Sequence, residues 1–313
     1  MKHPMTDFRN FLYVTWQHLN LPHPTDVQYD IADYLQTKDE KRKIIEAFRG
    51  VGKSWITSAF VCWRLLINPQ EKILVVSASK QRADDFSIFT KRLLGEMEIL
   101  QHLAPNDDQR NSNIAFDVAP SRASHAPSVK SVGVTGQMTG SRASLIIADD
   151  VESANNSATQ TQREKLSETI KEFEAILTPD PTSEIIYLGT PQTEESIYNL
   201  LAERGYKQQI WTARYPKDAK QLESYGPKLA PYVADKWTED NAWTAVDPDR
   251  FDDRDLSERE ASYGRSGFAL QFMLDTTLSD QDKYPLKLSD LIVMDIDRDK
   301  CPVKDAWGTR TEE

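Results

Sequence analysis

The sequence predicts an α/β fold of the P-loop NTPase type (ASCE or RecA-like), in which helices flank a mostly parallel sheet and a small helical subdomain is added. Two observations predict it. Short apolar, β-branched runs alternate with longer helical patterns, and a glycine-rich segment that ends in Lys-Ser follows the first run and opens a helix. The runs lie at about 43–47, 72–77, 144–149 and 184–189.

Helices are predicted after the first two runs. Apolar residues at helical spacing indicate one buried stripe on a helix that ends near Pro69. The residues of this stripe are Ile56, Phe60, Trp63 and Ile67. A similar pattern predicts a helix from Ser79 to about Leu100.

The organisation changes twice further along the chain. Prolines and polar residues at 101–143, with strand-like pieces at 114–118 and 129–134, predict an insertion or hairpin. The β/α alternation stops near residue 216, and helices are expected at about 254–263 and 266–275. We therefore expect three parts. They are an ATPase core at 1–215, a mainly helical subdomain at 216–283 and a connector at 284–313.

Composition restricts the possible functions. The 38 Lys and Arg stand against 49 Asp and Glu, a net charge of −11, so any nucleic-acid contact is expected to be local. Cys62 and Cys301 are too few for a disulfide framework or a four-cysteine zinc site. The longest apolar runs have the length of strands, so no membrane-spanning helix or signal peptide is predicted and a soluble, intracellular protein is favoured.

The segment from Ala47 to Ser54 has the pattern of a phosphate loop, or Walker A motif, with alanine in place of the first glycine. Gly50, Val51 and Gly52 would turn backbone N–H groups towards the phosphates of ATP. Lys53 would contact the β- and γ-phosphates, and Ser54 would bind Mg²⁺. Arg49 is interpreted either as a second phosphate ligand that senses the γ-phosphate or as a solvated loop residue.

An apolar strand ending in acids follows at 145–152 and has the pattern of a Walker B motif. Asp149 is predicted to hold Mg²⁺ and Asp150 to be the catalytic base, with Glu152 in reserve. Arg142 precedes this strand, so it would lie at the opposite end of the sheet from its own nucleotide. It is therefore better placed to act on a neighbouring subunit, although a surface ion pair is the simpler alternative.

Polar residues elsewhere complete the predicted site. Thr190 and Gln192 follow the next strand and would bind the attacking water or the γ-phosphate and relay its presence. Gln28 starts a helix capped by Thr25 or Asp26, and its amide could read the adenine edge. A set of basic residues after the second strand could contact DNA phosphates or simply be solvated. These residues are Lys80, Arg82, Lys91 and Arg92.

Together and in this order, the motifs resemble the ATPase part of the large terminase subunit of tailed phages, most closely the DNA maturase B proteins of short-tailed podophages. The segments that carry the resemblance are FRGVGKS (48–54), VVSASK (75–80), SVKSVGVTGQ (128–137), TGSRA (139–143), IADDVE (147–152), YLGTPQ (187–192) and GFALQFM (267–273).

The resemblance implies an ATP-driven motor that moves concatemeric double-stranded DNA into a procapsid. It implies a homo-oligomeric ring, pentameric when packaging, which docks on the portal in the host cytoplasm and works with a small terminase subunit. It also implies that Arg49 is the arginine of the phosphate loop, Gln28 the adenine reader, Arg142 the trans-acting arginine and 190–192 the coupling motif.

One departure from the family pattern is expected. Family members continue into an RNase H-like nuclease domain, whereas this chain ends about where such a domain would start, so no DNA cleavage is expected from it. Two other functions remain open from the residues alone. They are a helicase-like or other DNA-remodelling ATPase, and a small-molecule kinase, which would need a lid and no DNA.

Overall fold

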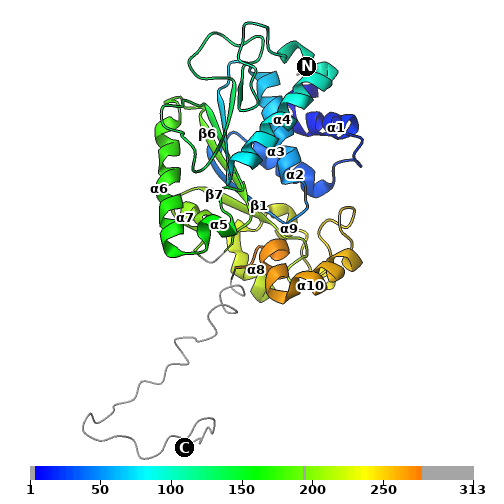
Figure 1. The fold of residues 1–313 in the computed structure, drawn as a ribbon. Coiled ribbons are helices and arrows are strands. Elements are labelled where there is room, and N and C mark those ends of the chain that lie inside the picture. The colour runs from blue at the N-terminus through cyan, green and yellow to red at the C-terminus, as the bar shows by residue number, and fades with distance from the viewer. Residues whose placement is uncertain (1–3, 193–194, 277–313) are drawn as a thin grey trace, which may run out of the picture.

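The computed structural model describes residues 4–192 and 195–276. Within them, seven strands form one sheet in the order β3-β4-β2-β5-β6-β1-β7 (Figure 1). β3 pairs antiparallel with β4, and all other neighbours are parallel. The strands are β1 Arg42–Ala47, β2 Ile73–Ser77, β3 Ala115–Phe116, β4 Val129–Gly133, β5 Leu145–Asp149, β6 Glu184–Gly189 and β7 Lys207–Trp211. The predicted mostly parallel α/β fold is therefore confirmed.

Two layers of helices cover the sheet (Figure 1). The first four helices share an apolar core with one face of the sheet, to which β1 contributes Ile45. Helices α6 and α7 share a second core with the other face, to which β1 contributes Ile44. The helices of the two layers are α1 Phe8–His18, α2 Asp26–Gln36, α3 Lys53–Ile67, α4 Lys80–Glu96, α5 Ala154–Ser157, α6 Gln160–Ile176 and α7 Ile197–Glu203.

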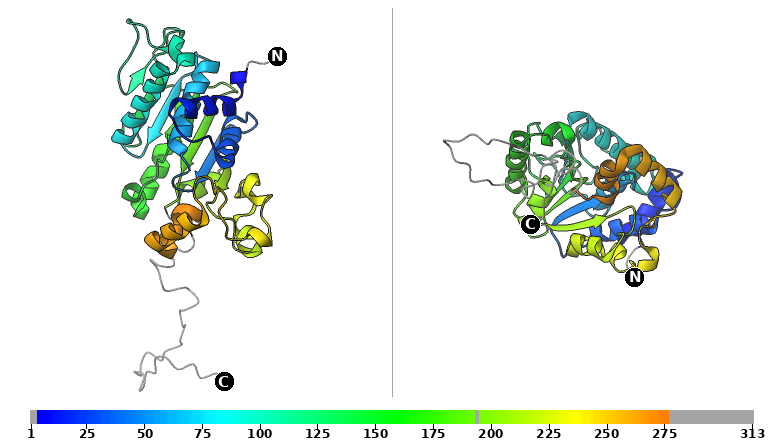
Figure 2. Two further views of the ribbon diagram at one scale, coloured as in Figure 1. Left: turned by 90° about the vertical axis from the view of Figure 1, so that its right-hand side faces the viewer. Right: turned by 90° about the horizontal axis from the view of Figure 1, so that it is seen from below.

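A mainly helical unit follows β7 and lies at one end of the sheet, as the left view of Figure 2 shows. Its helices are α8 Ala219–Tyr225, α9 Pro231–Ala234, α10 Asp253–Phe268 and a short π-helix, Ala269–Met273. The two helices expected at 254–263 and 266–275 are found on either side of a break at Gly264, where φ is 70° and ψ is 168°, and the second continues into the π-helix. The connector expected at 284–313 lies outside the described residues.

The insertion or hairpin expected at 101–143 is found in part: its two strand-like pieces form β3 and β4, which pair antiparallel, and β4 also pairs parallel with β2 in the main sheet. Two details of local structure differ from the prediction. Ile67, expected on the buried stripe, is 46% exposed because it is the last residue of α3. β7 was not predicted, because its first three residues, Lys-Gln-Gln, have no apolar pattern.

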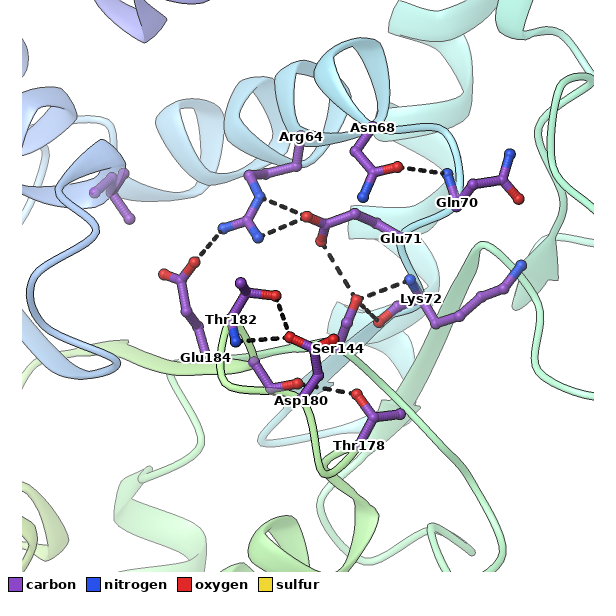
Figure 3. A network of polar contacts seen from close by, with 12 residues as sticks. Arg64, Asn68, Gln70, Glu71, Lys72, Ser144, Thr178, Asp180, Thr182 and Glu184 are labelled. Carbon is purple, nitrogen blue, oxygen red and sulfur yellow. Dashed lines mark hydrogen bonds and ion pairs between the residues drawn. The ribbon is translucent and has the colours of Figure 1, made fainter.

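The amino end of the sheet is closed by a buried ionic network (Figure 3). The Arg64 guanidinium donates to Glu71 at 2.7 Å and to Glu184, the first residue of β6, at 2.8 Å. Ser144, just before β5, accepts a hydrogen bond from the Lys72 backbone at 3.1 Å. Buried charges need such partners, because an unpaired one costs several kcal/mol, about 3–5 for a broken pair. The candidate site lies at the opposite, carboxyl end of the sheet.

No helix in the described ranges is both long and apolar enough to cross a membrane.

Candidate nucleotide site

The predicted phosphate loop joins the carboxyl end of β1 to the start of α3. Gly50 and Gly52 have φ of 94° and 98°, a region that side chains other than glycine rarely adopt. Gly52 is the residue before the first turn of α3, and no side chain caps that turn. The first N–H groups of a helix lack partners within the helix and attract anions. This fifteen-residue helix therefore points a donor-rich end at the loop.

A cavity of about 400 Å³ lies over this loop. Its described lining combines the loop with the carboxyl ends of the strands of the sheet. The residues are Arg49, Gly50, Gly52, Lys53, Ser54, Trp55, Arg82, Asp150, Glu152, Ser153, Thr190, Gln192 and Gln271. Most of the residues predicted from the sequence are thus brought together, from segments more than a hundred positions apart.

Lys53 spans two strand ends in the cavity. Its ammonium donates to the Ala47 carbonyl at 2.5 Å and lies 3.5 Å from the Thr190 hydroxyl. Burial lowers the pKa of Lys53, while the nearby Asp150 and Asp149 carboxylates act in the opposite direction. A partly buried cation held among carbonyl and hydroxyl oxygens is a good partner for a polyanion.

Asp149 ends β5 and is buried, and its Oδ1 makes no hydrogen bond with the described residues. Burial raises the pKa of Asp149, and the Asp150 carboxylate raises it further. Asp150 has a φ of 46°, and its backbone N–H donates to Leu188 at 2.7 Å. This left-handed turn directs the Asp150 side chain into the cavity, next to the buried Asp149.

Glu152 holds the segment that follows β6. Its Oε1 accepts the Gln192 backbone N–H at 2.9 Å, and its Oε2 accepts the Ser196 hydroxyl at 2.8 Å and the Ile197 backbone N–H at 2.7 Å. Burial raises the pKa of Glu152, against the effect of these three donors. Both carboxylate oxygens are therefore engaged, whereas the Asp150 side chain makes no hydrogen bond with the described residues.

The helical unit contacts the phosphate loop directly. The Arg49 backbone N–H donates to the Gln271 carbonyl at 2.9 Å, and the Arg49 guanidinium donates to the Gln271 side chain at 3.1 Å. Arg250 donates to the Gly50 carbonyl at 2.8 Å, and the Phe251 ring packs beside Phe48. The conformation of the phosphate loop thus depends on residues of the helical unit, about 200 positions further along the chain.

Gln28 lies beneath the loop and does not line the cavity. It is 3% exposed, and its Nε2 donates to the Val51 carbonyl at 2.7 Å. Its Oε1 accepts the Thr25 backbone N–H at 3.1 Å, which completes the predicted helix cap. Both ends of the amide are thus bonded within the protein, and reading of an adenine by Gln28 stays a prediction.

Arg142 lies away from this site. It is exposed, precedes β5 at the amino end of the sheet and lines a different cavity of about 420 Å³. Arg142 is therefore found at the end of the sheet opposite the nucleotide site, as expected. Its trans-acting role stays a prediction. Sequence reasoning missed Gln271 and did not assign Arg82 to the nucleotide site. The only local signal for Arg82 was its position just after the second strand.

The strand order, with β6 between the phosphate-loop strand β1 and the acidic strand β5, together with the glycine-lysine loop, defines an α/β protein with a P-loop NTPase fold. The family model described as "Terminase large subunit, T4likevirus-type, N-terminal" matches residues 44–264. This chain therefore belongs to the family of large terminase subunits.

The chain is also similar to individual proteins. The terminase large subunit of Enterobacteria phage T3 is 52% identical over 305 residues, a match that covers 96% of this chain and 52% of the relative. The chain thus spans about half the length of that protein. The large terminase ATPase domain of Thermus phage P74-26 is 14% identical, with a TM-score of 0.45 over 84% of this chain and 97% of that domain. The N-terminal domain of the DNA packaging ATPase of bacteriophage phi29 is 13% identical, with a TM-score of 0.36 over 52% of this chain and 80% of that domain.

Proposed function

We propose that this chain hydrolyses ATP and couples the hydrolysis to translocation of double-stranded DNA into a procapsid, as the ATPase part of a large terminase subunit. The observation that carries the proposal is the single cavity in which Lys53, Asp150 and Thr190 meet at the ends of three strands. Membership of the terminase family supplies the DNA-packaging context.

The phosphates of ATP would lie over the loop. The backbone N–H groups around Gly50, Val51 and Gly52 and the first turn of α3 would bind phosphate oxygens, and Lys53 would neutralise their charge. Arg49 would leave Gln271 to bind a phosphate. Gln28 would read the adenine, or act through its hydrogen bond to Val51 by fixing the loop.

The residues present fit a Mg²⁺ ion. Ser54 is exposed to the cavity, and the Asp149 Oδ1 is a buried carboxylate oxygen without a partner among the described residues. An oxygen ligand of this kind is what Mg²⁺ prefers, and nucleotide phosphates and waters supply the other ligands. When bound, Mg²⁺ would neutralise charge on the phosphates. Ser54 and Asp149 would hold it.

Asp150 is the proposed catalytic base, because its carboxylate faces the cavity and is free of strong hydrogen bonds. It would accept a proton from the attacking water. Arg142 of an adjacent subunit would neutralise charge that develops on the γ-phosphate. Glu152 would act by positioning, since it fixes the backbone of Gln192.

The segment at 190–192 would couple the site to the rest of the molecule. Thr190 lies 3.5 Å from Lys53, and Gln192 donates from its side chain to the Thr190 carbonyl at 3.0 Å. The next helix, α7, begins at Ile197, whose backbone N–H donates to Glu152 at 2.7 Å. A change at the γ-phosphate would therefore reach α7 through one carboxylate.

The wider arrangement follows the family. We divide the chain into an ATPase core at 1–215, a subdomain at 216–283 and a connector at 284–313. The partners would be double-stranded DNA, the portal of the procapsid, a small terminase subunit and further copies in a ring, in the host cytoplasm. No group of three His, Cys, Asp or Glu residues within 4–192 and 195–276 is placed to hold a metal.

The test is ATP turnover by the wild-type chain and by Lys53→Ala, with and without double-stranded DNA and procapsids. We expect turnover that rises with DNA and procapsids and that Lys53→Ala abolishes. Undiminished turnover in Lys53→Ala would refute the phosphate-loop assignment. Turnover indifferent to DNA but stimulated by a small hydroxyl acceptor would indicate a kinase instead.

A further inference from the structure

Arg82 lines the nucleotide cavity, although it belongs to a helix whose basic residues suggested either DNA contact or solvation. It lies in the first turn of α4, where its backbone N–H donates to Ser79, the capping residue, at 3.3 Å. Helix α4 starts three residues after the end of β2. The helix cap therefore fixes the backbone of Arg82 at the carboxyl end of the sheet.

The sheet order sets the place of Arg82 relative to the other functional groups. β2, β5, β6 and β1 are successive neighbours, and Ser77 of β2 is in register with Asp149 of β5. The carboxyl ends of these strands are followed in turn by Arg82, Asp150, Thr190 and Lys53. Arg82 and Lys53 therefore approach the cavity from opposite sides, with Asp150 between them.

The Arg82 guanidinium has free donors. It is 58% exposed, and its Nη1 lies 3.6 Å from the Asp150 Oδ2, an ion pair longer than a hydrogen bond. Its side chain makes no hydrogen bond with the described residues. A guanidinium carries five N–H donors in a planar fork that matches phosphate oxygens. The fork is thus available to an anion that enters beside Asp150.

We propose that Arg82 acts in cis as a ligand of the terminal phosphate of the bound nucleotide. This inference rests on the proposed ATPase function and adds a residue to it. Before nucleotide binds, Arg82 pairs with Asp150. When the γ-phosphate occupies the space between Lys53 and Asp150, the Arg82 fork turns to it, which frees the Asp150 carboxylate to accept a proton from water. Arg82 would thus distinguish ATP from ADP and prepare the base in one movement.

The test compares the affinities of ADP and of the non-hydrolysable analogue AMP-PNP, each with Mg²⁺, for wild type, Arg82→Ala, Arg82→Lys and Arg92→Ala. Arg92 is the matched control, because it lies on the same helix, is 67% exposed and pairs with Glu96 outside the cavity. Titration calorimetry gives the affinities, and thermal unfolding checks that each variant folds.

We expect Arg82→Ala to bind AMP-PNP about tenfold more weakly, as for the loss of a hydrogen bond to a charged group. ADP affinity should change less than about twofold, and Arg82→Lys should retain part of the difference because it keeps the charge without the fork. Arg92→Ala should bind both nucleotides like wild type. ATP turnover should fall about a hundredfold in Arg82→Ala.

Three results would overturn the inference. If Arg82→Ala bound ADP and AMP-PNP more weakly by the same factor, Arg82 would not act on the terminal phosphate. Unchanged binding and turnover in Arg82→Ala, with wild type active, would remove its role. If Arg82→Ala lost DNA binding but kept nucleotide affinity and turnover, the basic residues of α4 would be interpreted as DNA contacts. If wild type bound neither nucleotide, or Lys53→Ala bound both normally, the proposed function itself would fail.

Discussion

The Phe251 ring lies against Gly50 so closely that a Cβ atom on Gly50 would be 2.7 Å from the ring. The two residues are 201 positions apart. Gly50 also has a φ of 94°, so its lack of a side chain is required twice, by backbone conformation and by contact with the helical unit. The phosphate loop is therefore shaped by a residue that no loop motif contains.

Gly50→Ala should separate these two requirements when compared with Gly140→Ala. Gly140 has a similar φ of 85°, but nothing lies within 4 Å of its added Cβ. We expect Gly140→Ala to lose about 1–2 kcal/mol of unfolding free energy from backbone strain. Gly50→Ala should lose more and should also lose most ATP turnover. Urea unfolding and a turnover assay check this. Equal losses in both variants would show that the Phe251 contact contributes nothing.

Matched amide substitutions should separate the roles of Asp150 and Glu152. Asp150→Asn should reduce ATP turnover about a hundredfold or more, with unfolding free energy within about 0.5 kcal/mol of wild type. Glu152→Gln replaces an oxygen that accepts hydrogen bonds with an NH₂ group, so it should cost about 1–3 kcal/mol of stability.

Turnover and urea unfolding of both variants provide the measurements. If Glu152→Gln were as stable as wild type yet inactive, and Asp150→Asn active, the base would be Glu152. That result would reverse the assignment made from the hydrogen bonds at the two carboxylates.

Glu46 should make the stability of the chain fall as pH rises. Burial in β1 raises the pKa of Glu46 to about 8, against a hydrogen bond from Gln208 that acts the other way. A carboxyl with a raised pKa in the folded state contributes stability that is complete below the pKa of the unfolded chain, and this contribution is lost as pH rises through the folded pKa. The window therefore runs from about 4.5 to about 8.

Glu46→Gln should remove this dependence. We expect it to match wild type at pH 5 and to be more stable at pH 9 by at least about 1 kcal/mol. Urea unfolding at the two pH values is the measurement, and the exposed Glu98→Gln serves as the control. A difference between wild type and Glu46→Gln that does not change with pH would contradict the assignment.

Arg142→Ala should be rescued by a second inactive subunit if it acts on a neighbour. Mixed rings of Arg142→Ala and Lys53→Ala contain some sites with an intact Lys53 and an intact neighbouring Arg142, so part of the ATP turnover should return. Arg82→Ala mixed with Lys53→Ala should regain none, because both residues serve the same site. No recovery in demonstrated mixed rings would count against a trans-acting Arg142.

Much of the fold was predictable because its signals are local. Each of the four predicted apolar strands carries its own β-branched pattern, and the loop at 47–54 carries its glycines and lysine in sequence. β7 has no such signal, since it starts with Lys-Gln-Gln and becomes a strand by pairing with β1. Tertiary pairing supplied what the local pattern lacked.

The candidate site divides in the same way. Asp149 ends a strand and Lys53 and Asp150 follow strands, so these residues were predictable from their positions. Arg82 and Gln271 reach the cavity through the packing of α4 and of the helical unit, which no spacing in the sequence describes. The hydrogen bond from Gln28 to Val51 is likewise a product of packing between distant segments.

The contacts between the helical unit and the phosphate loop also bear on how the protein folds. Thr25 bonds Asp247 across 222 positions, and Gly50 bonds Arg250 across 200. Contacts so distant along the chain form late, because closing long loops costs entropy before any contact repays it. During synthesis, the loop would therefore acquire its final shape only after about 270 residues had been made. Nucleotide would then bind only after the helical unit had folded against the phosphate loop. Its binding energy would therefore stabilise the core and the helical unit together, and not the core alone.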